Sequence, residues 1–167
     1  MRHLTTFAIL PLVLLTSAPA HAQMVTITPE QIGQIFCIGS LGNDMAPVEA
    51  LLSDDLKTVV AEAWEKNAAF EAAHPGDKPP LGDGLPWRSW PDYADGCTVT
   101  EGTVEREEAA VVINYAFSEY PKANYTNFLV LKPATFNDGA SMVWRIDDID
   151  LGEGNSFRSV LAGAFEQ

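Results

Sequence analysis

Three aromatic residues, Trp87, Trp90 and Tyr93, lie close together in a stretch that is rich in proline and glycine. Flat aromatic faces can stack on sugars or apolar ligands, and the polar N–H and O–H tips of these side chains can orient what they bind. The alternative is that the rings cover the open end of a hydrophobic core. These three residues are the first candidates for a ligand site.

Three carboxylates, Asp147, Asp148 and Asp150, form the densest acidic cluster. Paired carboxylates can transfer protons or bind a hard cation. Strand alternation places Asp147 and Asp148 on opposite faces, and Asp148 shares the parity of Trp144 and Ile146. Asp148 is therefore a weak candidate for a catalytic pocket acid, and the alternative is a solvated acid at a strand end.

Other residues that could carry chemistry are few. A calcium loop is not expected, because Gly152 stands where an oxygen ligand is required. His74 is placed to meet the C-terminus of an alanine-rich helix. Tyr115 and Trp144 can line the cup of a sheet, although strand spacing also suits plain core residues. The sequence predicts no metal and no cofactor.

The two cysteines of the chain, Cys37 and Cys97, permit a single intramolecular pairing. Neither belongs to a CxxC motif, so redox catalysis is not expected. In an oxidising compartment these cysteines predict a disulfide that closes a loop of about 60 residues.

The N-terminal segment resembles a secretory leader. Arg2 and His3 precede the apolar run 7–15, and Ala20-His21-Ala22 fits a cleavage site, which predicts removal of residues 1–22. The apolar run is too short to span a bilayer, so stable membrane insertion is not expected. We therefore expect a periplasmic or secreted bacterial protein whose single domain covers residues 23–167.

The composition is acidic. The chain carries 10 Lys and Arg against 23 Asp and Glu, a formal net charge of −13. Such a surface repels nucleic acid and anionic lipid, so no nucleic-acid partner is expected. It suits either plain solubility or a cationic partner.

Helical signals fill the first part of the chain. Thr28-Pro29-Glu30-Gln31 predicts a capped helix that ends near Leu41. A short helical segment follows over 48–52, and Ser53 is placed to cap a long helix that continues to Ala73. The segment 74–96 has too many prolines and glycines for regular structure, but its aromatics predict a packed loop.

Strand signals fill the remainder. Alternating and β-branched residues predict four strands and a final short helix, over Thr98–Arg106, Ala109–Phe117, Asn124–Lys132, Ser141–Ile149 and Phe157–Phe165. The apolar run Phe128–Leu131 suggests a central strand or one covered on both faces. Helices followed by an antiparallel meander predict an α+β fold with N-terminal helices packed on a curved sheet of about four strands.

This layout resembles the NTF2-like (cystatin-like) superfamily, and in particular a group of uncharacterised exported bacterial proteins within it. The resemblance is carried by Trp144-Arg145-Ile146-Asp147-Asp148-Ile149, by Ile35-Phe36, and by Gly154, Ser156, Phe157, Arg158 and Leu161. It implies a cone in which helices lie in the cup of a bent sheet, with a pocket between them, and the superfamily's sheets often dimerise. The long loop 74–96 and the cysteine pair depart from the pattern.

Three functions follow as expectations. The first is a non-enzymatic domain that binds a small molecule or an envelope protein through the sheet cup and the loop 74–96. The second is a metal-independent hydrolase or isomerase that uses Asp148. The third is an acidic partner or inhibitor protein that docks a basic target. The fold hosts enzymes and binding proteins alike, so the fold does not choose between them.

Overall fold

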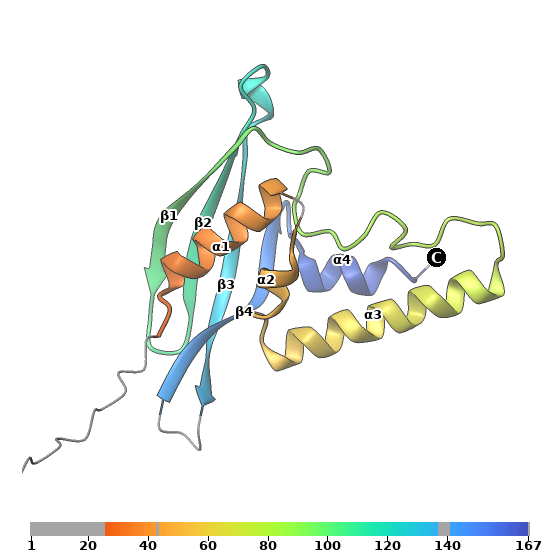
Figure 1. Cartoon of the computed structure of the whole chain (residues 1–167), viewed down its shortest axis with the longest axis horizontal. Coiled ribbons are helices and arrows are strands. Elements are labelled where there is room, and N and C mark those ends of the chain that lie inside the picture. Colours follow the sequence, from red (N-terminus) through yellow and green to blue (C-terminus); the bar gives the residue numbers. More distant parts are fainter. Residues whose placement is uncertain (1–25, 43, 137–140, 167) are drawn as a thin grey trace, which may run out of the picture.

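The computed structural model describes residues 26–42, 44–136 and 141–166. Helices come first, then an antiparallel sheet and a short C-terminal helix (Figure 1), as expected for the α+β class. The helices are α1 (Pro29–Gly42), α2 (Ala46–Glu49), α3 (Asp54–Ala73), the 3₁₀ helix η1 (Pro121–Ala123) and α4 (Phe157–Gly163). The leader expected over residues 1–22 lies outside the described residues.

The described sheet has five strands in the order β1-β2-β3-β4-β5, so the expected number of about four is wrong. The strands are β1 (Gly96–Val104), β2 (Ala109–Ala116), β3 (Tyr125–Phe136), β4 (Ser141–Gly152) and β5 (Asn155–Ser156). The additional strand, β5, has two residues and pairs with the end of β4. A strand this short carries no alternation of polar and apolar residues, so no sequence pattern reveals it.

The predicted helix starts are confirmed by their caps. The Gln31 N–H donates to Thr28 Oγ1 at 3.2 Å, and the Thr28 N–H donates to Gln31 Oε1 at 2.9 Å. Ser53 Oγ accepts the Leu56 N–H at 3.0 Å at the start of α3, and Ser156 caps α4. Each side-chain oxygen satisfies an N–H that the first helical turn leaves without a backbone partner.

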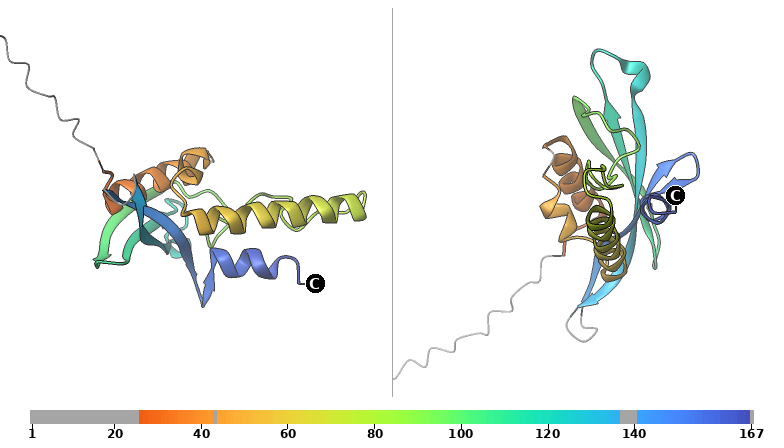
Figure 2. Two further views of the ribbon diagram at one scale, coloured as in Figure 1. Left: turned by 90° about the horizontal axis from the view of Figure 1, so that it is seen from below. Right: turned by 90° about the vertical axis from the view of Figure 1, so that its right-hand side faces the viewer.

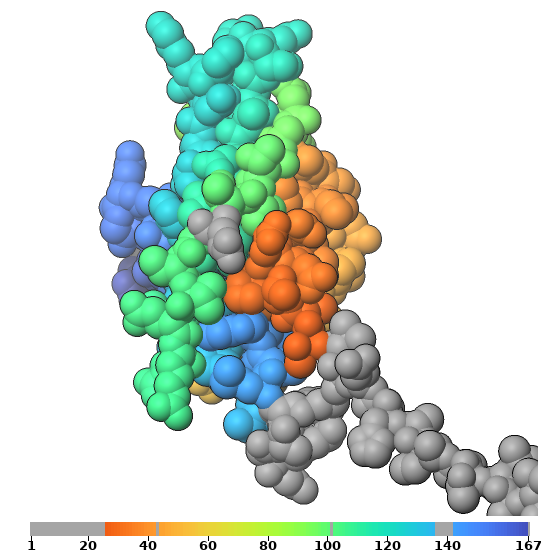
Figure 3. All heavy atoms as spheres, turned by 90° about the vertical axis from the view of Figure 1, so that its left-hand side faces the viewer, coloured from red at the N-terminus to blue at the C-terminus, as the bar shows by residue number. Residues whose placement is uncertain are grey.

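Helix α1 lies across β1 and β2 (Figures 1 and 2) and buries Ile32 and Phe36 completely. Gly33 permits the close approach, because a Cβ at this position would lie 2.6 Å from Val111 Cγ1 and 2.8 Å from Val99 Cγ1. In the space-filling view the side chains of α1 lie against the strands without a wide gap (Figure 3). The absence of a side chain at Gly33 therefore allows α1 to lie this close to the sheet.

The predicted disulfide between Cys37 and Cys97 is confirmed, with Cα atoms 5.7 Å apart and a sequence separation of 60. It joins the second half of α1 to the first residues of β1. The bond therefore fixes α1 on the sheet and fixes the end of the loop 74–96, which leads directly into β1.

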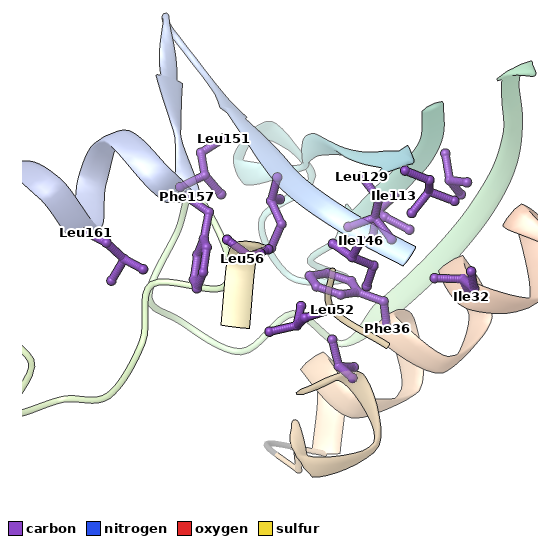
Figure 4. Close-up of a cluster of buried hydrophobic side chains, with 14 of the residues drawn as sticks. Ile32, Phe36, Leu52, Leu56, Ile113, Leu129, Ile146, Leu151, Phe157 and Leu161 are labelled. Atoms are coloured by element: carbon purple, nitrogen blue, oxygen red, sulfur yellow. The ribbon is translucent and has the colours of Figure 1, made fainter. Parts of the chain in front are cut away.

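The N-terminal helices do not all lie on the sheet. Helix α1 does, whereas α3 extends away beyond β4, side by side with α4 (Figure 2). The hydrophobic core follows this arrangement and runs from α1 and the sheet to the α3–α4 pair (Figure 4). Its largest fully buried side chains are Tyr115, Phe36, Phe157, Ile32, Leu52, Leu56, Ile113, Leu129, Leu131, Ile146, Ile149 and Leu161.

The run Phe128–Leu131 belongs to β3, which is the central strand of the sheet, as expected. Leu129 and Leu131 are fully buried, but Phe128 is 40% exposed on the opposite face. This strand is therefore covered on one face, and the alternative of cover on both faces is wrong.

The middle of β4 receives the connection between α2 and α3. The Ile146 N–H donates to the Leu51 carbonyl at 2.9 Å, and the Ser53 N–H donates to the Ile146 carbonyl at 2.8 Å. These two bonds form a single parallel bridge between Leu52 and Ile146. They occupy the edge of β4 that faces away from β3 and set the point from which α3 departs.

A β-bulge interrupts β4 beside this bridge. Val130 pairs with Asp148, but the next residue of β3, Leu131, pairs with Ile146, so Asp147 is an extra residue in the strand. A bulge changes which side chains share a face. Ile146 and Asp147 are consequently both buried, although they are adjacent in the sequence.

The buried carboxylate of Asp147 connects three elements. It accepts hydrogen bonds from Ser53 Oγ at 2.8 Å, Lys132 Nζ at 2.6 Å and Arg158 Nη2 at 2.9 Å. Burial by itself would raise the pKa of Asp147, but the bonds from Lys132 and Ser53 and the charge of Arg158 lower it below its ordinary value. The ionised carboxylate thus joins α3, β3 and α4 at one point.

We predict that the Cys37→Ala/Cys97→Ala variant loses up to about 4 kcal/mol in the free energy of unfolding, the chain-entropy value for a loop of this length. Urea denaturation with and without a thiol reductant measures the difference. The reductant should destabilise the parent protein and leave the double variant unchanged. Equal stability of the two proteins without reductant would contradict the prediction.

We predict that Asp147→Asn lowers the free energy of unfolding by about 2–3 kcal/mol at neutral pH, because hydrogen bonds to a charged group are lost. Since the pKa of folded Asp147 lies below 3.8, its contribution is fully present above pH 3.8 and is lost as the pH falls through the folded pKa. The difference from the parent protein should therefore narrow in acid.

Denaturation series at several pH values test this prediction. Glu65→Gln, an exposed change in the middle of α3, is the matched control and should alter stability by less than about 0.5 kcal/mol. A difference between parent and Asp147→Asn that widens in acid would contradict the assigned pKa shift.

Candidate functional site

The loop 74–96 is packed against the domain at several points. The Leu81 N–H donates to the buried side-chain oxygen of Asn67 at 2.7 Å. Further along, the ring of Trp87 stacks on Phe157 of α4, with ring centroids 4.8 Å apart. Loop backbone without regular hydrogen bonds needs such partners when it lies against a core, and here the partners hold the loop between α3 and the sheet.

Asn127 attaches the same loop to β3. Its Oδ1 accepts the Ser89 N–H at 3.3 Å, and its Nδ2 donates to Ser89 Oγ at 2.9 Å. Asn127 is fully buried, and its amide is satisfied by these two bonds together with one from Nδ2 to the Thr126 carbonyl at 3.3 Å. The bonds between Asn127 and Ser89 fix the backbone between Arg88 and Trp90. These two residues lie between two hollows of the surface.

Two hollows lie on either side of the segment 86–90. We call the larger one the Trp90 groove, of about 870 Å³. Its loop side consists of Pro86, Arg88, Ser89 and Trp90. Its other walls include Lys122, Tyr125 and Thr126 near the start of β3, and Leu151, Glu153, Asn155 and Val160 around β5 and α4.

We call the smaller hollow the Tyr93 groove, of about 550 Å³. Ser40 and Met45 form one side, and the remaining walls come from 83–88, Trp90, Pro91 and Tyr93. Both volumes fall in the range of small-molecule sites. Because Pro86, Arg88 and Trp90 line both grooves, these residues form the ridge between them.

Arg88 is held in this ridge by two contacts. Its Nη1 donates to the Ser40 carbonyl at 2.8 Å, and its guanidinium lies 4.5 Å from the centre of the Tyr93 ring. A cation above an aromatic face is attracted by the negative charge density of that face. Both contacts are with residues of the Tyr93 groove, and the half-buried Arg88 side chain also lines the Trp90 groove.

A chain of hydroxyl groups continues from this point into the core. Tyr115 O–H donates to Ser40 Oγ at 3.0 Å, and Ser40 Oγ donates to the Cys37 carbonyl at 2.9 Å. Burial raises the pKa of Tyr115 to about 12, although the bond to Ser40 and the charge of Arg88 oppose the rise. The phenol therefore stays protonated and donates its proton within the core.

Tyr125 stacks on Tyr115, with ring centroids 4.7 Å apart, and Tyr125 is one of the residues that line the Trp90 groove. Burial and the neighbouring Tyr115 raise the pKa of Tyr125 as well. Its hydroxyl is buried and has no hydrogen-bond partner in the described part of the chain. Both phenols are neutral at physiological pH, so they add no negative charge to the groove.

The structure brings together three of the five residues proposed from sequence for ligand binding. Trp90 and Tyr93 are each 51% exposed, and Trp87 lies beside them in the wall of the Tyr93 groove. Trp87 also packs on Phe157, so this ring both lines a groove and covers a core residue. Tyr115 is a core residue, and half-buried Trp144 packs against the core and lines neither groove.

The candidate acid Asp148 does not line either groove. Its Oδ1 accepts the Ile149 N–H at 2.8 Å and the Arg158 N–H at 3.1 Å. The bulge at Asp147 breaks the parity that linked Asp148 to Ile146, so that expectation of a shared face is wrong. The carboxylate instead receives backbone N–H groups of β4 and of the first turn of α4.

The two positive charges of the Trp90 groove, Arg88 and Lys122, and the clamp residue Asn127 were not among the residues expected from sequence. Arg88 stands between Trp87 and Trp90, which is a signal that sequence reasoning could have used. Lys122 and Asn127 have no such signal, because Lys122 reaches the site in η1 just before β3, and Asn127 reaches it through the pairing of β3 with β2.

The described residues show two further facts about the site. Within these ranges no three His, Cys, Asp or Glu side chains are grouped so as to hold a metal ion. No helix of the same residues has the length and apolar character needed to cross a bilayer.

Comparisons with protein-family profiles, with curated proteins and with solved structures find no match to this chain. The geometry of the grooves and the chemistry of their walls therefore carry the functional argument.

We predict that Asn127→Ala loosens the loop from β3, because it removes both hydrogen bonds to Ser89. Hydrogen exchange at the backbone amides of Ser89 and Trp90 should become faster, with a cost in unfolding free energy of about 1–3 kcal/mol. Asn114→Ala is the matched control, since Asn114 bonds Thr100 and Thr126 and no loop residue. Unchanged exchange at Ser89 in Asn127→Ala would show that the clamp does not hold the loop.

Proposed function

We propose that this protein is an exported, non-enzymatic binding domain that holds a small molecule in the Trp90 groove. The observation that carries the proposal is the ridge of Arg88 and Trp90, which presents a charge and an exposed aromatic face beside two grooves of suitable volume. Binding sites of this kind combine apolar walls with a few fixed polar groups.

The fixed position of the ridge supports binding in particular. Trp87 stacks on Phe157, Ser89 is bonded to Asn127, and Arg88 is bonded to Ser40. A site that is already ordered loses little conformational entropy when a ligand enters, so more of the contact energy becomes affinity.

The same observations weigh against a hydrolase or isomerase centred on Asp148. That carboxylate accepts backbone N–H groups, and it stands apart from both grooves. Tyr125 at the Trp90 groove and Tyr115 behind it in the core have raised pKa values, so both phenols stay protonated and are poor bases at neutral pH. The walls of the groove supply recognition chemistry more readily than proton transfer.

An envelope protein remains the second candidate occupant, because the exposed rings of Trp90 and Tyr93 also suit a protein interface. A periplasmic or secreted location and an NTF2-like origin belong to the same proposal. The disulfide is compatible with an oxidising compartment. The curved sheet with α1 across it agrees with a cone, whereas α3 extends beyond the sheet.

Native mass spectrometry of the protein recovered after export tests the proposal. We expect an additional mass of small-molecule size that disappears on denaturation. Ala123→Trp should abolish it by placing an indole ring in the space that a ligand would occupy, because Ala123 lines the Trp90 groove. Ala61→Trp, at an exposed position of α3, is the matched control and should retain the mass.

A protein that carries no ligand, or an Ala123→Trp variant that retains it, would contradict binding in this groove. Co-purification of a second polypeptide by the parent protein, with loss in Trp90→Ala, would favour the envelope-protein alternative.

A further inference from the structure

The charge of the Trp90 groove is opposite to that of the whole chain. The chain has a net charge of −13, yet the groove walls carry Arg88 and Lys122 against a single acid, Glu153. Charges of one sign in a concave wall raise the local concentration of the opposite ion. A protein with so many acids would be expected to pair its few cations with its own carboxylates.

Arg88 is not paired in that way. Lys57, Lys78, Lys132 and Arg158 each form an ion pair, whereas Arg88, in common with Lys66, Arg106, Lys122 and Arg145, lies within ion-pair distance of no carboxylate among the described residues. An unpaired guanidinium that is half removed from water is unfavourable unless an anion accompanies it. Arg88 differs from the other unpaired cations in being both half-buried and part of a groove wall, and this position suits an anionic ligand from outside the chain.

The guanidinium of Arg88 also retains free donors. Arginine has five N–H donors, and the contact found for Arg88 in the described residues uses one nitrogen, on the Ser40 carbonyl. Its planar fork matches the two oxygens of a carboxylate or phosphate. The attachments to Ser40 and Tyr93 fix the fork before any ligand arrives.

The remaining walls of the groove are apolar and partly flat. Trp90 is half-exposed and borders the groove with the ring of Tyr125, and Leu151 and Val160 lie on the side of β4 and α4. A small inorganic ion would leave these surfaces in water, whereas an aromatic or aliphatic body would cover them. These apolar walls therefore favour a ligand that has an organic body as well as a charged group.

We propose that the ligand of the Trp90 groove is an organic anion whose flat apolar body lies against Trp90 and whose acidic group binds Arg88. This inference rests on the proposed function and names the chemical class of the molecule. Lys122 contributes a second, exposed charge at the rim, which draws the anion in and weakens with salt.

Matched pairs of probes test the class. 2-Naphthoate and its neutral amide, 2-naphthamide, are titrated into the ¹⁵N-labelled disulfide-bonded protein, and amide shifts are followed by NMR. We expect 2-naphthoate to shift groove residues such as Ser89 and Thr126 and to bind about tenfold or more tightly than the amide. Its binding should weaken as salt is raised.

Two pairs of variants locate the contacts. Arg88→Gln should weaken 2-naphthoate about tenfold or more and leave the amide unchanged, whereas Arg106→Gln, an exposed arginine outside both grooves, should change neither. Arg88→Lys retains the charge without the fork and should give an intermediate loss. Trp90→Ala should weaken both probes, and Trp64→Ala on α3 should weaken neither.

The outcomes separate the two levels of the proposal. Equal binding of both probes in the groove, or an Arg88→Gln variant that binds 2-naphthoate as tightly as the parent protein, would overturn the anionic class and leave the binding function standing. Shifts confined to residues outside the groove for both probes, together with an empty native mass spectrum, would overturn the class and the proposed function.

Discussion

The fold depends on the middle of β4, where one buried carboxylate and two backbone hydrogen bonds hold three parts of the chain together. Asp147 is an extra residue in the strand, and its ionised side chain receives Ser53, Lys132 and Arg158. A buried charge without partners is costly, so the three donors must be in place when the carboxylate is buried. Because those donors come from the N-terminus of α3, from β3 and from α4, the same requirement places all three elements.

The candidate site follows from that placement. Once Arg158 and Asp148 fix the first turn of α4, Phe157 faces the core and offers its ring to Trp87. The loop 74–96 can then cross the gap between α3 and the sheet, attached by Asn67 and Asn127. Arg88 and Trp90 lie on a ridge because the residues on either side of them are held, and the grooves are the space that remains on both sides of that ridge.

The charged side chains of Asp147 and Arg88 have different kinds of partner. Asp147 is satisfied within the chain, with a pKa lowered by its partners, and it contributes to structure. Arg88 is attached by a carbonyl and an aromatic ring, which position a cation without neutralising it. In the function that we propose, this cationic groove would admit a small organic anion through an otherwise acidic exterior.

The sequence by itself determined the local elements of this protein. The capping residues Thr28 and Ser53, the alternation in 109–116 and the spacing of Cys37 and Cys97 are short-range signals, and each led to an element or bond that the structure contains. Tertiary structure alone decided the bulge at Asp147, the two-residue β5 and the departure of α3 from the sheet. These three features depend on which residues of neighbouring segments pair with one another. The hydrophobic periodicity of the sequence does not reveal such shifts in register. The same holds for the site: the aromatic residues of the loop were visible in the sequence, whereas their meeting with Lys122, Asn127 and Tyr125 was decided by packing between distant segments.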